Sequence, residues 1–227
     1  MNALRPPGAV MEGVAAKLGR RPRQGKPASR RAAPVPCLWF LTDPIRTPDP
    51  IAIAARLPRG AAVVYRTFGS EDRLAIASAL RRLTHARGLK LLIGTDWRLA
   101  AVVGADGVHL PQRLAYLAPR LRRSRPGWLI STAAHNQAAI IAAARWRVDA
   151  ILASVVFDSR SRSATGRVLG PVRFAAMVRA SWLPVIALGG VNDRTAPRLL
   201  RSAAAGLAGV EVFEKAGGGR ARPQPRT

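Results

Sequence analysis

The chain has 227 residues, 48% of them hydrophobic, which is enough to build one α/β domain with a sizeable core. Its single cysteine excludes a disulfide framework and a cysteine-based metal site, and no apolar run reaches the roughly 18 residues of a membrane helix. The formal net charge of +25 favours anionic partners, although the chain contains no RNA-binding motif. We therefore expect a cytoplasmic protein without membrane contact, for which nucleic acid is a partner only through basic tails.

The two ends of the chain are predicted to be disordered. Residues 1–36 and 215–227 are rich in Arg, Pro and Gly and show no sustained hydrophobic period. A short helix over residues 10–18 finds no support in this pattern. The folded domain is therefore expected over residues 37–214, with a disordered basic tail on each side.

Short apolar runs recur between the tails. They are continuous rather than alternating, which is typical of parallel strands that are buried on both faces. The predicted strands are residues 37–42, 61–68, 90–95, 106–110, 128–135, 150–157, 184–190 and 207–213.

Helical patterns fill the gaps between these strands. They cover residues 51–57, 73–87, 96–103, 113–123, 137–146, 172–181 and 193–205. Ser70 is the expected N-cap and Gly88 the expected end of the second helix, and Asn136 is the expected N-cap of the fifth. This alternation predicts a small (β/α)8 TIM barrel of the α/β class. A doubly wound open sheet is the alternative, but no GxGxxG motif follows the first strand.

Functional side chains of a (β/α)8 barrel lie at the C-terminal ends of its strands. Gly189 and Gly190 follow the seventh strand and would present backbone N–H groups to a phosphate. Arg66 follows the second strand, and Arg160 and Arg162 lie in the loop after the sixth. Because guanidinium groups match phosphate oxygens, these residues predict an anion site. A solvated loop without a ligand is the alternative for the loop arginines.

Two histidines also end predicted strands. An imidazole titrates near neutrality, so His135 and His109 are candidates for general acid or base catalysis. Hydrogen bonding of either ring to a loop carbonyl is the structural alternative. The remaining polar candidates at strand ends are Asp43, Thr95, Asp96 and Gln112.

Four segments, LWFLTD, LLIGTDWRLAAVVGADGVHLPQ, SVVFDSRSRS and PVIALGGVN, together resemble the thiamine phosphate synthase superfamily, which includes the thiazole tautomerases. The resemblance covers roughly residues 37–213 and implies the barrel fold. It also implies a phosphate site at Gly189, Gly190 and the loop after the eighth strand, where Phe213 lies. Synthases of this family join an aminomethylpyrimidine diphosphate to a thiazole phosphate, with magnesium on the diphosphate.

The chain departs from the synthase pattern at the metal site. Thr95 stands where the family has a metal-binding Asp, and Leu114 stands where it has a second acidic residue. Arg66 is retained, whereas Ala133 replaces a family Ser and Arg162 replaces a family Lys. Asp96, one position from the lost Asp, would serve Mg²⁺ only if the end of the strand shifted.

These departures favour a tautomerase-like enzyme that needs no metal or cofactor. In this hypothesis His135, which the resemblance aligns with a tautomerase acid/base, moves a proton on a phosphorylated thiazole. The first alternative is a divergent thiamine phosphate synthase that holds Mg²⁺ with Asp96 and Asp43. The second is a non-catalytic barrel that binds a phosphorylated ligand or, through its tails, nucleic acid. The sequence leaves the oligomeric state open, with a homodimer as one option.

Overall fold

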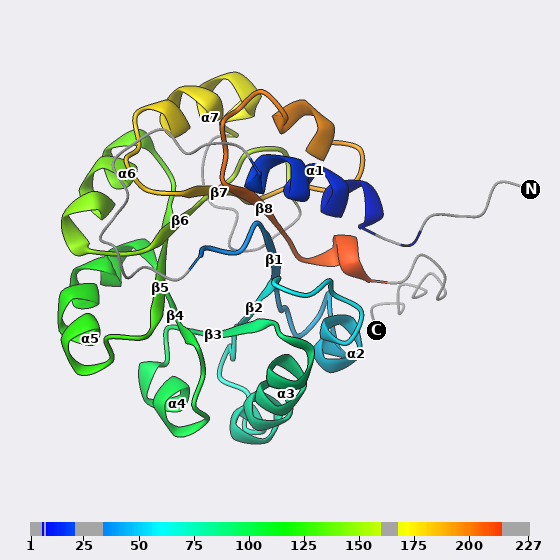
Figure 1. Ribbon diagram of the computed structural model, residues 1–227, viewed down its shortest axis with the longest axis vertical. Helices are drawn as coiled ribbons and strands as arrows, with labels where there is room; N and C mark the ends of the chain where they lie inside the picture. The colour runs from blue at the N-terminus through cyan, green and yellow to red at the C-terminus, as the bar shows by residue number, and fades with distance from the viewer. Residues whose placement is uncertain (1–5, 7, 21–33, 160–167, 215–227) are drawn as a thin grey trace, which may run out of the picture.

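A computed structural model describes residues 6, 8–20, 34–159 and 168–214 of the chain. Its centre is a closed barrel of eight parallel strands that pair in chain order from β1 to β8, and β8 pairs with β1 (Figure 1). The strands are β1 (Leu38–Leu41), β2 (Ala62–Tyr65), β3 (Lys90–Gly94), β4 (Gly107–Leu110), β5 (Leu129–Ala134), β6 (Ala150–Ala153), β7 (Val185–Ala187) and β8 (Gly206–Gly209). The predicted (β/α)8 barrel is therefore confirmed.

Helices surround the barrel as an outer ring (Figure 1). The α-helices are α1 (Ala9–Gly19), α2 (Pro50–Ala54), α3 (Arg73–Arg87), α4 (Trp97–Val102), α5 (Ala118–Ser124), α6 (Gln137–Ala143) and α7 (Gly170–Arg179). Short 3-10 helices are η1 (Gln112–Leu117), η2 (Ala144–Trp146), η3 (Ala196–Leu199) and η4 (Glu211–Phe213). No helix within these described ranges has the length and apolarity needed to cross a membrane.

The capping predictions are confirmed at two of three positions. Gly88 ends α3 in the left-handed conformation, and the Asn136 side chain accepts a hydrogen bond from the backbone N–H of Ala139 at the start of α6. Ser70 is not the N-cap of α3, because that helix begins after Asp72.

The predicted helix over residues 193–205 is wrong in extent, because only the 3-10 helix η3 forms there. The Asn192 side chain accepts hydrogen bonds from the backbone N–H groups of Arg194 and Thr195, which holds the chain in a turn. Pro197 then lacks the N–H that an α-helical hydrogen bond needs.

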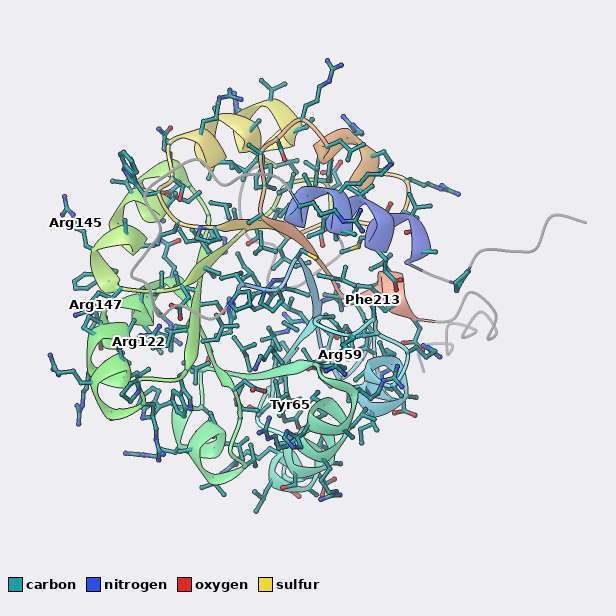
Figure 2. All side chains as sticks on the ribbon, viewed as in Figure 1. Arg59, Tyr65, Arg122, Arg145, Arg147 and Phe213 are labelled. Atoms are coloured by element: carbon teal, nitrogen blue, oxygen red, sulfur yellow. The ribbon has the colours of Figure 1, made fainter. Side chains whose placement is uncertain are left out.

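The apolar core has two parts, one on each side of the barrel wall. The inner part is filled by side chains such as Trp39, Leu92, Leu152 and Ile186, which are fully buried inside the barrel. The outer part lies between the strands and the helices. The charge of the domain lies outside these layers, as the exposed Arg145 and Arg147 at the periphery illustrate (Figure 2).

Helix α1 corrects the expectation that residues 1–36 are disordered, because residues 9–19 of that segment are helical and packed. Met11, Val14, Ala15 and Leu18 recur at a helical spacing and are all buried on one face. This face packs against β8 and η3 (Figure 1). Residues 1–5, 7, 21–33 and 215–227 of the two predicted tails lie outside the described residues.

The spacing of these apolar residues was present in the sequence, whereas the position of α1 on the barrel was not. Within the described residues β8 is followed by the short η4, so α1 covers an outer face of β8 that no later α-helix covers there. The helix is held at its N-terminus by Asp193, whose carboxylate accepts hydrogen bonds from the backbone N–H groups of Gly8, at 3.1 Å, and Met11, at 2.8 Å. Both contacts come from parts of the chain that are distant in sequence.

Replacing Leu18 with alanine is expected to lower the free energy of unfolding by about 2–4 kcal/mol, because the side chain is buried between α1 and the barrel. Urea denaturation followed by circular dichroism measures this change. Lys17→Ala is the matched control, since Lys17 is exposed on the same helix and should change stability by less than about 0.5 kcal/mol. Equal stability of the two variants would mean that α1 does not pack on the barrel in solution.

Candidate active site

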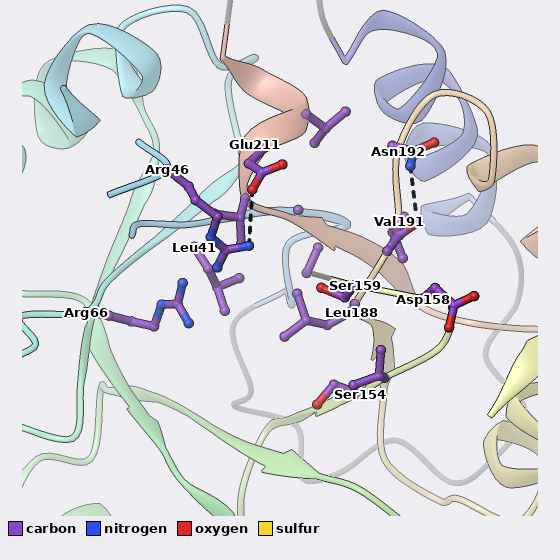
Figure 3. Close-up of a pocket in the computed structure, with 17 residues that line it drawn as sticks. Leu41, Arg46, Arg66, Ser154, Asp158, Ser159, Leu188, Val191, Asn192 and Glu211 are labelled. Atoms are coloured by element: carbon purple, nitrogen blue, oxygen red, sulfur yellow. Dashed lines mark hydrogen bonds and ion pairs between the residues drawn. The ribbon is translucent and has the colours of Figure 1, made fainter. Parts of the chain in front are cut away.

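A pocket of about 300 Å³ opens at the C-terminal ends of β1, β2, β6, β7 and β8 (Figure 3). Arg46 and Arg66 line one side of it, and Gly189 and Gly190 line another. The pocket thus brings together the guanidinium and glycine parts of the predicted anion site, at the end of the barrel where this fold places its function. Ser154, Asp158 and Glu211 complete its polar lining.

The loop after β7 presents a row of unpaired backbone donors to the pocket. Gly189 and Gly190 have φ angles of 90° and 64°, in the left-handed region that favours glycine. Their carbonyl groups accept hydrogen bonds from the loop itself and from Phe157 N–H. Within the described part of the chain, the backbone N–H groups of Gly189, Gly190 and Val191 donate to no acceptor. Successive free N–H groups of this kind bind phosphate oxygens.

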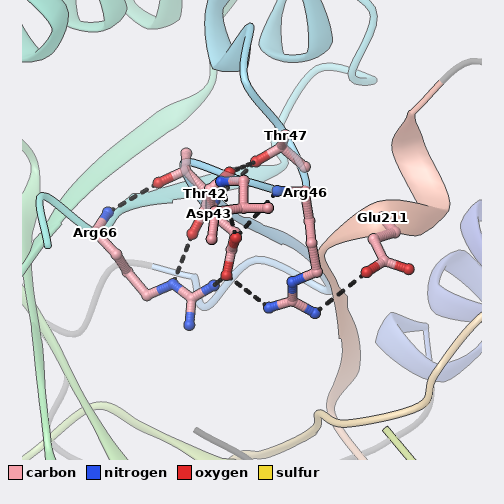
Figure 4. A network of polar contacts seen from close by, with 7 residues as sticks. Thr42, Asp43, Arg46, Thr47, Arg66 and Glu211 are labelled. Carbon is pink, nitrogen blue, oxygen red and sulfur yellow. Dashed lines mark hydrogen bonds and ion pairs between the residues drawn. The ribbon is translucent and has the colours of Figure 1, made fainter. Parts of the chain in front are cut away.

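A cluster of charged side chains, of which Arg46, Arg66 and Glu211 line the pocket, lies after β1, β2 and β8 (Figure 4). The Asp43 carboxylate is 2.8 Å from Arg46 Nη2 and 3.5 Å from Arg66 Nη2. Arg46 Nη1 is 3.5 Å from Glu211 Oε1, and Arg66 Nε donates to the carbonyl of Thr42 at 2.7 Å. Burial alone would raise the pKa of Asp43, but hydrogen bonds from the side chain and backbone of Arg46 lower it overall.

Arg66 is the most constrained member of this cluster. Only 17% of its side chain is exposed, and its Nη2 atom is buried without a hydrogen-bond partner among the described residues. The pKa of Arg66 is lowered to about 10, mainly by burial, with Asp43 opposing this shift and Arg46 adding to it. The guanidinium therefore stays charged near neutrality.

His109 lies in the barrel wall rather than in the pocket lining. Its neighbours Val108 and Leu110 face the outer core, so the alternation of a strand turns His109 into the barrel. Its Nδ1 atom is 3.0 Å from Ser131 Oγ. Burial, followed by the charge of Arg66, lowers the pKa of His109 to about 4. The imidazole is therefore neutral near neutrality.

His135 is exposed and lies beside the pocket without lining it. Its Nδ1 atom is 3.1 Å from both the carbonyl oxygen and Oγ of Ser154, and Ser154 does line the pocket. The backbone N–H of His135 donates to Gln112 Oε1 at 3.2 Å. These contacts tie the ends of β4, β5 and β6 together.

The other predicted site residues do not line the pocket. Asp96 accepts a hydrogen bond from Leu99 N–H as the N-cap of α4, and exposed Thr95 has a φ of 68°. Phe213 is buried in the outer core, where its ring packs edge-on against Phe40 at 5.8 Å between centroids. Arg160 and Arg162 lie outside the described residues.

Sequence reasoning missed Arg46, which lines the pocket and binds Asp43. The available signal was the spacing of the two residues, since an acid and a base three positions apart in a tight turn are well placed to pair. Asp43 accepts hydrogen bonds from the backbone N–H groups of Ile45 and Arg46, so this turn is built around its carboxylate.

The residues at the pocket do not fit a magnesium ion at the positions that the resemblance implies. All His, Cys, Asp and Glu residues of the chain fall in the described ranges, and no group of three or more of them there could hold a metal ion. Thr95 is exposed, and Leu114 packs against the outer core. Mg²⁺ prefers carboxylate oxygens, and neither position offers one.

Comparisons with known proteins match one family over most of the chain. A family model described as thiamine monophosphate synthase matches residues 40–213. The thiamine-phosphate synthase of Alcanivorax borkumensis is 30% identical over 187 residues, which cover 78% of this chain and 84% of that protein. The thiamine-phosphate synthase of Chloroflexus aurantiacus is 31% identical over 165 residues, covering 70% and 75% respectively. Three further curated relatives are matched over 64% to 68% of their length.

A solved structure supports the architecture. The thiamine phosphate pyrophosphorylase from Pyrococcus furiosus aligns with a TM-score of 0.67 at 22% identity, over 78% of this chain and 90% of that one. At this identity the likeness concerns the fold alone.

Proposed function

Because this chain belongs to the thiamine monophosphate synthase family, we propose that it joins an aminomethylpyrimidine diphosphate to a thiazole phosphate. The main support for this proposal is the pocket, which has a volume of about 300 Å³. Residues with free backbone N–H groups line one side of it, and two arginines line another. Two differently charged phosphate groups need two anion sites, and the pocket offers one on each side. This is the alternative that the sequence left open, and the relatives named above favour it over the tautomerase hypothesis.

The reaction makes defined demands on these two sites. The lone pair of the thiazole nitrogen attacks the exocyclic methylene carbon of the pyrimidine, and a C–N bond forms. The C–O bond to the diphosphate breaks, and its electrons leave with pyrophosphate. The protein must hold the two substrates in line and stabilise the charge that develops on the leaving group.

The glycine loop suits the phosphate of the thiazole. Gly189, Gly190 and Val191 line the pocket, and their N–H groups have no competing acceptor in the described residues. Arg66 suits the leaving diphosphate, since its side chain lines the pocket and its guanidinium stays charged near neutrality. In this family magnesium supplies further positive charge to the diphosphate, but the residues here do not fit that ion, so no step is derived through it.

A tautomerase-like reaction is the second candidate, and one contact favours it. His135 Nδ1 is 3.1 Å from Ser154 Oγ, and Ser154 lines the pocket. Against this candidate, the imidazole itself does not line the pocket. The two candidates make different predictions for the same variant.

Incubating the full chain with both substrates is expected to yield thiamine phosphate and pyrophosphate, measured by chromatography with ultraviolet detection. His135→Ala is expected to lose less than about tenfold in rate, because a general acid or base contributes about 10²–10⁴-fold and the coupling reaction does not need one at this position. No product, with or without added Mg²⁺, would contradict the synthase proposal. Isomerisation of the thiazole phosphate that is lost in His135→Ala would support the second candidate instead.

A further inference from the structure

The carboxylates near the pocket are engaged in contacts other than ion binding. Asp43 is held by two guanidinium groups, and Asp96 caps α4. Glu211 is half exposed beside Arg46. The Asp158 carboxylate points away from Arg46 and Arg66 (Figure 3). No cluster of carboxylates in the described residues therefore faces the position where a diphosphate would meet the arginines.

The cation that this pocket does contain is guanidinium. Arg46 and Arg66 share the single carboxylate of Asp43, which leaves one net positive charge on the three groups. Glu211 offsets little of this charge, because its pairing distance is 3.5 Å and its side chain is 52% exposed. Arg66 lines the pocket beside Arg46, so both guanidinium groups lie within reach of a ligand there.

We propose that Arg46 and Arg66 bind the diphosphate directly and neutralise it in place of a divalent cation. This rests on the proposed function for the identity of the substrate, while the binding itself is a property of the pocket. Arg46 is the residue added to the site, since it comes from the turn after β1 and reaches the pocket through its pair with Asp43 (Figure 4).

Guanidinium groups have the properties that this role needs. Each presents planar, forked donors that match phosphate oxygens, and each remains charged at neutral pH. Arg66 is mostly buried, so its attraction for an anion is weakened less by solvent than that of a surface arginine. Asp43 orients both groups, and both line the pocket that a diphosphate would enter.

The test uses inorganic pyrophosphate as the probe and the full chain as the protein. Isothermal titration calorimetry is performed at fixed ionic strength with excess EDTA and again with excess Mg²⁺, because added salt would itself weaken charge–charge binding. The dissociation constant is expected to differ by less than about threefold between the two conditions. Arg46→Gln and Arg66→Gln are each expected to weaken binding by about 10- to 100-fold, the loss of one charge-assisted hydrogen bond.

Arg82→Gln is the matched control. It removes the same charge from an exposed position of α3 outside the pocket and is expected to weaken binding by less than about twofold. If Arg66→Gln does not fold, Arg66→Lys keeps the charge but loses the forked donors, and its binding should fall between the wild-type and glutamine values. The far-ultraviolet circular dichroism spectrum identifies folded variants.

The outcomes separate this inference from the proposed function when the same samples are assayed for thiamine phosphate. Pyrophosphate binding that requires Mg²⁺, or that survives both arginine substitutions, overturns the inference even if thiamine phosphate forms. Arginine-dependent binding in EDTA supports the inference even if no thiamine phosphate forms, a result that would count against the proposed function alone.

Discussion

Gly190→Ala is expected to lower the free energy of unfolding by about 2–5 kcal/mol and to abolish most substrate turnover. A Cβ atom there would lie 2.3 Å from the carbonyl oxygen of Asp158 and 2.7 Å from that of Phe157, so the backbone must shift. Overpacking of this kind costs about 1–3 kcal/mol, and the left-handed φ of 64° adds about 1–2 kcal/mol for alanine. The shift would also displace the N–H groups that face the pocket, and a misplacement of 1 Å costs about 10²-fold in rate.

Gly104→Ala isolates the steric part of this effect. Gly104 has a φ of 65°, almost the same as Gly190, but a Cβ atom there would meet nothing within 4 Å. We expect it to lose about 1–2 kcal/mol from its backbone conformation and to keep its activity. Urea denaturation and the coupling assay compare the two variants. Equal losses would show that the close contact between the loops after β6 and β7 does not matter.

Acidification from pH 7 to pH 4 is expected to lose about 3 kcal/mol of stability through His109 alone. Burial, with the charge of Arg66 adding to it, lowers the pKa of His109 to about 4, below the 6.5 of an unfolded histidine. Above pH 6.5 the imidazole is neutral in both states and contributes no pH dependence. Below pH 6.5 His109 is protonated in the unfolded chain but stays neutral in the folded protein. The free energy of unfolding therefore falls progressively until about pH 4.

The difference between wild type and His109→Gln, measured as urea midpoints across this range, tests the assignment. Carboxylates titrate in both proteins, so only the extra slope of the wild type between pH 6.5 and pH 4 belongs to His109. Glutamine keeps a polar group near Ser131 without an ionisable proton. His85→Gln, at an exposed position of α3, should leave the pH dependence of the wild type unchanged. Parallel curves for wild type and His109→Gln would contradict the buried, neutral imidazole.

The strands were predictable because each is a continuous apolar run, but four of them were predicted to end three or four residues too late. The runs over residues 61–68, 150–157, 184–190 and 207–213 continue past β2, β6, β7 and β8. Val155, Val156 and Phe157 are buried as strand residues would be, yet they belong to the loop beside the pocket. An apolar run indicates that residues are buried, but it does not indicate that they pair in a strand. Residues at the mouth of a barrel are buried without such pairing.

The site was predictable only where the chemistry is local. Gly189 and Gly190 could be assigned to an anion site because two adjacent glycines after a strand are a local signal of exposed N–H groups. The pairing of Arg46 and Arg66 through Asp43 required the loops after β1 and β2 to meet. Phe213, predicted at the phosphate site, turned into the core because Phe40 and the start of α1 lie against it.

The sequence by itself determined the eight-stranded barrel and the place of the glycine loop at its pocket, since apolar runs and paired glycines act within a few residues. The tertiary structure alone decided three other features: the packing of α1 on β8, the buried neutral state of His109 and the arginine cluster at the pocket. Each of these depends on contacts between segments far apart in the chain. The burial and charge of a residue at such a contact depend on its distant neighbours, which a local sequence pattern does not identify.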